Sequence, residues 1–233
     1  MSFILWVPAS ILNEKLIINP SDTSVYWILP KQDIGFTFQE KSMKKSLLIL
    51  LAFYLWAFTL TAQENAKMSP ALLVIDVQKK YVPMMSEDDR ESALEMMNWA
   101  IWLFRQYELP VIRVYHTSEK WGPAPGTDEF AFHDSLKVVE SDPMVIKTYG
   151  SGFNKTELDS LLQAKGINTL FMCGLSSTGC VLATYMDASN YDYKAFLVKG
   201  ALLGPTSDYT RQVEDMFDAI SLNTANFLLK QKE

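Results

Sequence analysis

The chain has little of what builds metal centres and disulfide frameworks. Its 233 residues include only two cysteines, Cys173 and Cys180, and two histidines, His116 and His133. Two cysteines do not make the network of disulfides that stabilises small exported domains. Two histidines also limit any metal site that depends on imidazole ligands.

Basic clusters and a glycine-rich phosphate loop are absent as well. The chain carries 21 lysine and arginine residues against 27 aspartate and glutamate residues, for a net charge of −6. An acidic chain without basic clusters is a poor partner for nucleic acids and for anionic membranes. The first apolar run is followed by DVQKKYVP at residues 76–83, without the G-x-G-x-x-G pattern that lets a pyrophosphate approach a helix N-terminus. We therefore expect a small-molecule substrate, no nucleic acid partner and no cofactor.

One segment, MKKSLLILLAFYLWAFTLTA at residues 43–62, has the layout of a secretory signal peptide. Its apolar run over residues 46–60 is shorter than the roughly 20 residues of a membrane-spanning helix. We therefore predict an exported protein, periplasmic or secreted, with an N-terminal membrane anchor as the alternative. Residues 1–42 show no persistent period, and we interpret them as an upstream extension from a mis-called start, with translation beginning at Met43. N-terminal sequencing of the precursor tests this, and an intact Ser2 terminus would contradict it.

From residue 68 to residue 230 the sequence alternates short apolar runs with helical patterns. The apolar runs, which we predict as strands, lie at residues 71–76, 111–117, 143–147, 168–174 and 193–200, with a short final strand at 225–230. Helices are predicted from Ser86 to Tyr107 and at residues 156–166, 179–190 and 207–219. This alternation is typical of one α/β domain, a three-layer, Rossmann-like parallel sheet with helices on both faces.

Three reactive or charged residues follow the ends of predicted strands. Asp76 ends the first strand, Lys147 ends the third, and Cys180 lies just beyond the fourth. Ligands bind at the carboxyl ends of strands in such sheets, so we expect these side chains to converge. Asp76 alone could equally cap a turn. An unpaired lysine would be costly to bury, so Lys147 predicts an anionic partner such as Asp76 or a Cys180 thiolate.

The two cysteines have different sequence surroundings. Cys180 follows a strand and a turn rich in glycine and serine, at the start of a helical pattern. A helix N-terminus favours the thiolate, which is the nucleophilic form, and such turns expose nucleophiles in α/β folds. Cys173 lies inside an apolar strand, where a cysteine is ordinarily a small buried hydrophobe.

Three segments together resemble the signature blocks of the isochorismatase-like cysteine hydrolases. They are LLVIDVQ at 72–78, IKTYGSGFNKTELDSLL at 146–162 and CGLSSTGCVLATYMDA at 173–188. That superfamily includes nicotinamidases, N-carbamoylsarcosine amidase and ureidoamide hydrolases. The resemblance implies a catalytic triad of Asp76, Lys147 and Cys180. It also implies a cis peptide at Leu175–Ser176 and an oxyanion hole made by the amides of Ser176 and Cys180.

The activity implied by the resemblance is hydrolysis of a small amide, carbamoyl or related carbonyl substrate through a thioester. Metal-dependent nicotinamidases carry a D-x-H…H block after the second strand, where this chain has HTSEKW at 116–121, so we expect no metal. Isochorismatases proper cleave a vinyl ether and do not need the cysteine, which makes Cys180 an argument for amide chemistry. Isochorismatase-type hydrolysis of another small molecule and a catalytically silent binding protein remain alternatives. The relatives also imply a homo-oligomer.

Four further residues near the predicted site are candidate substrate contacts. They are Tyr81, His116, Trp121 and Phe153. Each lies in a strand end or in a loop that follows one, but aromatic residues in this fold more often belong to the core, and a histidine there is as often packed as functional.

Overall fold

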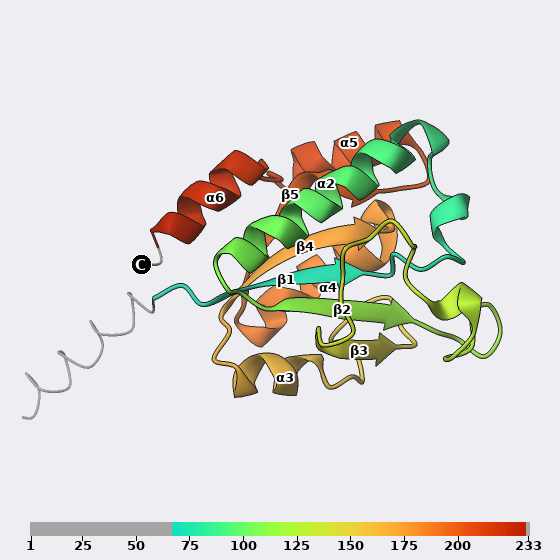
Figure 1. The fold of residues 1–233 in the computed structure, drawn as a ribbon, viewed down its shortest axis with the longest axis horizontal. Helices are drawn as coiled ribbons and strands as arrows, with labels where there is room; N and C mark the ends of the chain where they lie inside the picture. Colours follow the sequence, from blue (N-terminus) through green and yellow to red (C-terminus); the bar gives the residue numbers. More distant parts are fainter. Residues whose placement is uncertain (1–66, 232–233) are drawn as a thin grey trace, which may run out of the picture. The chain divides into compact units, whose positions relative to one another are not determined.

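A parallel sheet forms the centre of the computed structural model, which describes residues 67–231 (Figure 1). Its five strands pair in the order β3-β2-β1-β4-β5, and every pairing is parallel. The strands are β1 (Pro70–Ile75), β2 (Val111–His116), β3 (Met144–Lys147), β4 (Thr169–Leu175) and β5 (Lys194–Leu203). The predicted strands before residue 200 are confirmed, and β5 continues three residues further than predicted.

Helices cover both faces of the sheet, as predicted. They are α2 (Glu87–Gln106), α3 (Leu158–Ala164), α4 (Leu182–Ala188), α5 (Ser207–Met216) and α6 (Leu222–Lys230). Side chains alternate between the faces of a strand, so Leu72 and Val74 of β1 pack in the cluster that contains α2 and α6. Leu73 and Ile75 pack in the opposite cluster, with residues of α3 and α4. The three-layer α/β prediction is therefore confirmed.

The predicted final strand at residues 225–230 is wrong, because this segment belongs to helix α6. The side chain of Ser221 accepts a hydrogen bond from the amide of Thr224 and caps the helix. Ala225 and Leu229, four residues apart, are buried in the cluster that contains α2. A short apolar run fits a strand or a buried helix equally well, and only these tertiary contacts decide between them.

The predicted signal segment at 43–62 and the extension at 1–42 lie outside the described residues. Within residues 67–231, no helix combines the length and the apolar character that crossing a membrane requires.

Candidate active site

The strand order places the carboxyl ends of β1 and β4 at the switch point of the sheet. From β1 the chain proceeds outward to β2 and β3, and it then returns to the other side of β1 with β4. Open α/β sheets bind ligands in the crevice at such a point. Asp76 follows β1 and Cys180 follows β4, so both lie at this crevice. His116 and Lys147, the last residues of β2 and β3, are register partners beside it.

Lys147 and Asp76 form a buried ion pair. The Lys147 Nζ lies 2.7 Å from the Asp76 Oδ2, with side-chain exposures of 0% and 3%. The Lys147 ammonium also donates to the Nδ1 of His116 and to the carbonyl oxygen of Tyr149, each at 3.2 Å. Its three protons therefore have three acceptors. A buried charge is tolerated when it is paired and hydrogen-bonded in this way.

Asp76 has one carboxylate oxygen that is free of hydrogen bonds. Its Oδ2 accepts from Lys147, whereas its buried Oδ1 has no partner among the described residues. Burial raises the pKa of Asp76, although the charge of Lys147 opposes the shift. The backbone of Asp76 has a φ of 55°, a left-handed conformation that side-chain-bearing residues adopt infrequently. A strained backbone position of this kind is typical of functional sites.

The structure brings Cys180 to this ion pair. A carboxylate oxygen of Asp76, a ring nitrogen of His116 and the Cys180 Sγ all lie within 4.8 Å of one another. The cysteine lies in a π-helical turn, Ser177–Val181, that leads into α4. Burial, followed by the charge of Asp76, raises the pKa of the Cys180 thiol to about 11, and Lys147 opposes this. Burial and the charge of Asp76 thus oppose the thiolate that a helix N-terminus favours.

The turn between β4 and Cys180 has the predicted backbone. The Leu175–Ser176 peptide bond is cis, which confirms the prediction from the resemblance. The amides of Gly179 and Val181 both donate to the Ser176 carbonyl oxygen. The amide of Ser176 itself donates to no acceptor within residues 67–231. This amide is thus a hydrogen-bond donor available at the crevice.

Tyr81 lies next to the site with an unsatisfied hydroxyl. Its ring centroid is 5.9 Å from that of His116, and its buried hydroxyl has no partner among the described residues. Burial, together with the charges of Asp76 and Cys180, raises the pKa of Tyr81 to about 12. A buried hydroxyl without a partner is costly, so Tyr81 is well placed to bond a ligand.

Phe153 and Trp121, the other two candidate substrate contacts, lie in opposite environments, one buried and one exposed. Phe153 is 2% exposed, and its ring stacks on Tyr191 and Tyr193 at centroid distances of 4.7 and 5.6 Å. The ring of Phe153 is therefore packed against these two tyrosines and leaves little surface for a substrate. Trp121 is 77% exposed, with Lys120 over its ring. Its contact with a substrate stays a prediction.

Sequence reasoning missed Gln78. This fully buried side chain accepts from the amide of His116 at 2.7 Å and donates to the carbonyl oxygen of His116 at 3.1 Å. It thereby joins the segment after β1 to the end of β2. The only signal in the sequence is a polar residue three positions after a buried strand.

The site also contains three side chains of kinds that can bind a metal ion: Asp76, His116 and Cys180. However, the Lys147 ammonium is already hydrogen-bonded to Asp76 and His116, so a fixed positive charge lies beside the position that a cation would take. His133 joins no comparable group in the described part of the chain. These residues do not fit the aspartate and paired histidines of a metal-dependent relative.

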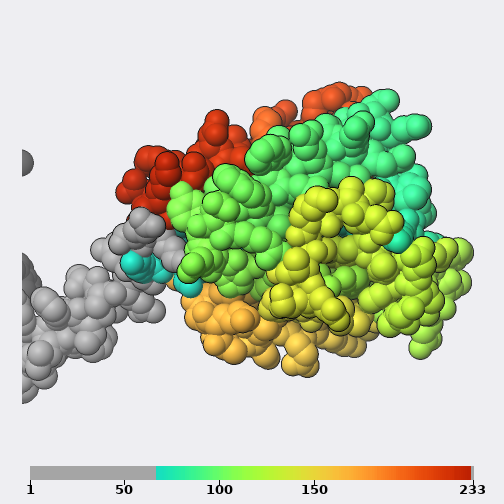
Figure 2. All heavy atoms as spheres, viewed as in Figure 1, coloured from blue at the N-terminus to red at the C-terminus, as the bar shows by residue number. Residues whose placement is uncertain are grey.

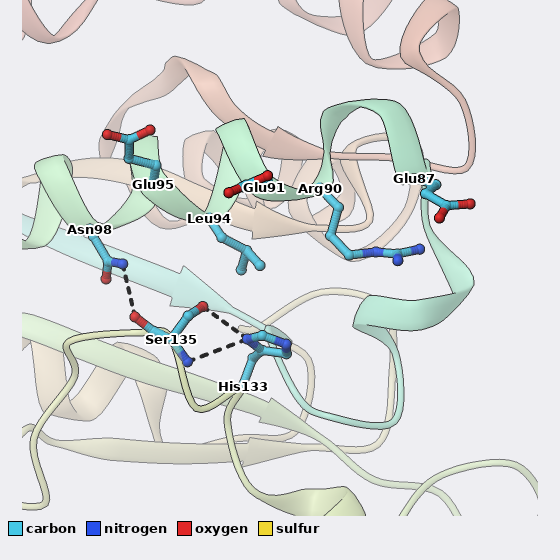
Figure 3. Close-up of a pocket in the computed structure, with 8 residues that line it drawn as sticks. All are labelled: Glu87, Arg90, Glu91, Leu94, Glu95, Asn98, His133 and Ser135. Carbon is cyan, nitrogen blue, oxygen red and sulfur yellow. Dashed lines mark hydrogen bonds between the residues drawn. The ribbon is translucent and has the colours of Figure 1, made fainter.

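His133 instead lines a separate groove of about 510 Å³ beside α2 (Figure 3). Its Nδ1 lies 2.9 Å from the hydroxyl of Ser135, whose carbonyl oxygen accepts from Asn98. In Figure 2 the yellow-green chain around residue 133 lies beside the green α2. Glu87, Glu91 and Glu95 give the α2 side of the groove a row of carboxylates.

Comparison with known proteins identifies the family. The model of the isochorismatase domain matches residues 70–225. The chain belongs to the isochorismatase family. It is 31% identical over 155 residues to the uncharacterized isochorismatase family protein YddQ of Bacillus subtilis, an alignment that covers 64% of this chain and 83% of YddQ.

Other members of the isochorismatase family have names that state an activity. The ureidoacrylate amidohydrolase RutB of Agrobacterium fabrum is 36% identical over 91 residues, which cover 38% of this chain and 39% of RutB. The structure of N-carbamoylsarcosine amidase from Thermoplasma acidophilum superposes with a TM-score of 0.58 at 25% identity, over 66% of this chain and 93% of that one. An isochorismatase-like hydrolase from Alkaliphilus metalliredigens shares the fold with a TM-score of 0.60 and 22% identity, over 68% and 97%. This protein is accordingly an isochorismatase-family hydrolase.

Proposed function

We propose that this protein is a cysteine amidohydrolase that cleaves a C–N bond of a small amide or N-carbamoyl compound. The observation that carries the proposal is the buried Lys147–Asp76 pair, one carboxylate oxygen of which lies within 4.8 Å of the Cys180 Sγ. A nucleophile, a base and a group that orients the base are the parts required for acyl transfer.

The first half of the reaction forms a covalent intermediate. Asp76 takes the proton of the Cys180 thiol, and the Sγ attacks the carbonyl carbon of the substrate. The raised pKa of Asp76 makes its carboxylate a better proton acceptor, whereas the raised pKa of the Cys180 thiol opposes the transfer. The amides of Ser176 and Cys180 stabilise the oxyanion, a contribution of roughly 3–4 kcal/mol per donor in other enzymes.

The second half releases the amine and restores the thiol. Protonated Asp76 gives its proton to the leaving nitrogen as the C–N bond breaks, which leaves an acyl group on Cys180. Asp76 then accepts a proton from water, whose oxygen attacks the thioester carbon. The departing sulfur recovers that proton. Lys147 remains charged throughout and holds the Asp76 carboxylate in place.

The names of two relatives and the buried hydroxyl of Tyr81 support an N-carbamoyl compound as the substrate class. Ureidoacrylate and N-carbamoylsarcosine, in the names of two relatives, both contain an N-carbamoyl group. The Tyr81 hydroxyl, buried and without a partner, can donate a hydrogen bond to such a substrate. The chemistry needs no metal, because Lys147 supplies the positive charge beside Asp76.

A screen for ammonia release tests the proposal. The purified full chain is incubated with N-carbamoyl amino acids, ureido acids, nicotinamide and simple aliphatic amides, in parallel with Cys180→Ala and with Cys173→Ala as the matched control. We expect release that requires Cys180, tolerates Cys173→Ala and persists in EDTA. Activity that survives in Cys180→Ala would refute the nucleophile, and an absence of ammonia release from every compound of the panel would favour a silent binding protein.

A further inference from the structure

The position of Lys147 depends on three segments that are distant in the sequence. Its ammonium is fully buried and donates to Asp76 after β1, to His116 at the end of β2 and to the backbone of Tyr149 after β3. A lysine side chain has several rotatable bonds, so its charge stays at one point only when each donor has an acceptor in a fixed place. Asp76 is the reacting partner, which leaves His116 as the one other side chain that fixes the ammonium.

The backbone of His116 is itself fixed by hydrogen bonds from a buried side chain. The side-chain amide of Gln78 makes two hydrogen bonds to the backbone of residue 116, one to its amide at 2.7 Å and one to its carbonyl oxygen at 3.1 Å. Gln78 is 0% exposed, so no water competes for these bonds. On the other side, the ring of His116 contacts Tyr81. The imidazole is therefore fixed both at its backbone and at its ring.

We propose that His116 is a positioning residue, which accepts a hydrogen bond from Lys147 at its Nδ1 and thereby keeps the ammonium against Asp76. This inference rests on the proposed cysteine amidohydrolase function. Because Nδ1 accepts, the imidazole is neutral and carries its proton on Nε2. Burial, followed by the charge of Lys147, lowers the pKa of His116 to about 4, which agrees with a neutral ring at physiological pH.

This role differs from substrate binding, the role that the sequence suggests for His116. A substrate contact would use the Nε2 proton, since Nδ1 is occupied by Lys147. The groups that face the ring are Asp76, Lys147, Tyr81, Cys180 and the backbone of Tyr149. Within the described residues, the ring's side-chain hydrogen bond is the one from Lys147 to Nδ1. Variants that place a hydrogen-bond acceptor at the position of Nδ1 or at that of Nε2 therefore distinguish the positioning of Lys147 from a contact with the substrate.

Three substitutions of His116 make this test. His116→Asn places a carbonyl oxygen near the position of Nδ1, and His116→Gln places one near the position of Nε2. His116→Leu has a size close to that of asparagine and no acceptor. Each variant is made in the full chain, and near-UV circular dichroism verifies that it is folded.

We expect the asparagine variant to keep kcat within about 5-fold of the parent, because a charge-assisted hydrogen bond to Lys147 is retained. The glutamine and leucine variants should lose about 10- to 100-fold in kcat with little change in KM, the loss typical of an unsatisfied buried donor. Should the leucine variant not fold, the asparagine and glutamine pair still decides the question. The rate of Cys180 alkylation by iodoacetamide should follow the same order, and it needs no substrate.

Two results would overturn the inference. If all three variants stay near the parent in kcat and in alkylation rate, His116 does not position Lys147. If asparagine is as damaging as leucine while glutamine is tolerated and KM changes, His116 acts through Nε2 on the substrate. Failure of the proposed function has another signature, ammonia release that survives in Cys180→Ala.

Discussion

The interior of β4 and the turn beyond it present the same chemical group, a thiol, in two environments. Cys173 is fully buried in β4, where its Sγ donates weakly to the carbonyl oxygen of Leu73 and burial alone raises its pKa. Cys180, seven positions later, is partly exposed, and its pKa is raised less because it is less buried, while Asp76 raises the pKa further and Lys147 opposes it. Under the proposed mechanism, charged neighbours and access, rather than the thiol itself, distinguish the nucleophile from the buried cysteine.

The largest effect should come from removing the two thiols in turn. Cys180→Ala should lower kcat by at least about 1,000-fold, as loss of a nucleophile does in other hydrolases. Cys173→Ala should leave kcat within about 2-fold, because the residue only fills space in the strand. Steady-state ammonia release measures both. Equal losses in the two variants would remove the functional distinction between these cysteines.

The second largest effect should come from removing the charge of Lys147, which lies near Cys180 and not near Cys173 in the interior of β4. Lys147→Met removes the ammonium but keeps much of the side-chain volume, so Asp76 is left buried and unpaired. We expect a loss of about 3–5 kcal/mol in the free energy of unfolding together with a loss of activity. Lys79→Met is the control: this lysine pairs with Asp128 and Asp134 at the surface, and its loss should change stability far less. Urea denaturation measures both, and similar shifts would contradict the account.

A smaller effect is expected at Tyr81, whose ring lies beside His116. Tyr81→Phe removes the hydroxyl that has no partner in the described structure. If this hydroxyl bonds the substrate, KM should rise by about 10-fold with kcat little changed, the value of one hydrogen bond. Tyr209→Phe, at a tyrosine that is 53% exposed on α5, serves as the control. An unchanged KM in Tyr81→Phe would exclude the contact.

The smallest effect is on the pH dependence of stability. The pKa of His116 falls from 6.5 to about 4 on folding, so between these values the unfolded chain binds a proton that the folded chain does not. Stability should therefore decrease as the pH falls from 6.5 toward 4. The raised pKa of Asp76 acts in the opposite direction, so the useful quantity is the difference between the parent and His116→Asn. As the pH falls from 6.5 toward 4, the free energy of unfolding of the parent should fall relative to that of His116→Asn. A difference that stays constant with pH would contradict the lowered pKa of His116.

Much of this arrangement could be predicted from the sequence. Apolar runs at regular spacing indicated the parallel sheet, and Asp76, Lys147 and Cys180 at strand ends indicated where side chains meet. Local pattern does not report tertiary burial, however. It therefore misassigned the segment of α6, and it did not indicate that Phe153 is buried or that burial opposes ionisation of Cys180. Gln78 was missed because its importance lies in bonds to a residue 38 positions away.

Mass spectrometry of the reacting enzyme tests the central claim most directly. The full chain is mixed with a substrate found in the ammonia screen, quenched in acid within the first turnovers and digested. The account predicts a mass increase equal to the acyl group on the peptide that contains Cys180, and no such adduct in Cys180→Ala. An adduct on any other residue, or continued ammonia release by Cys180→Ala, would contradict it.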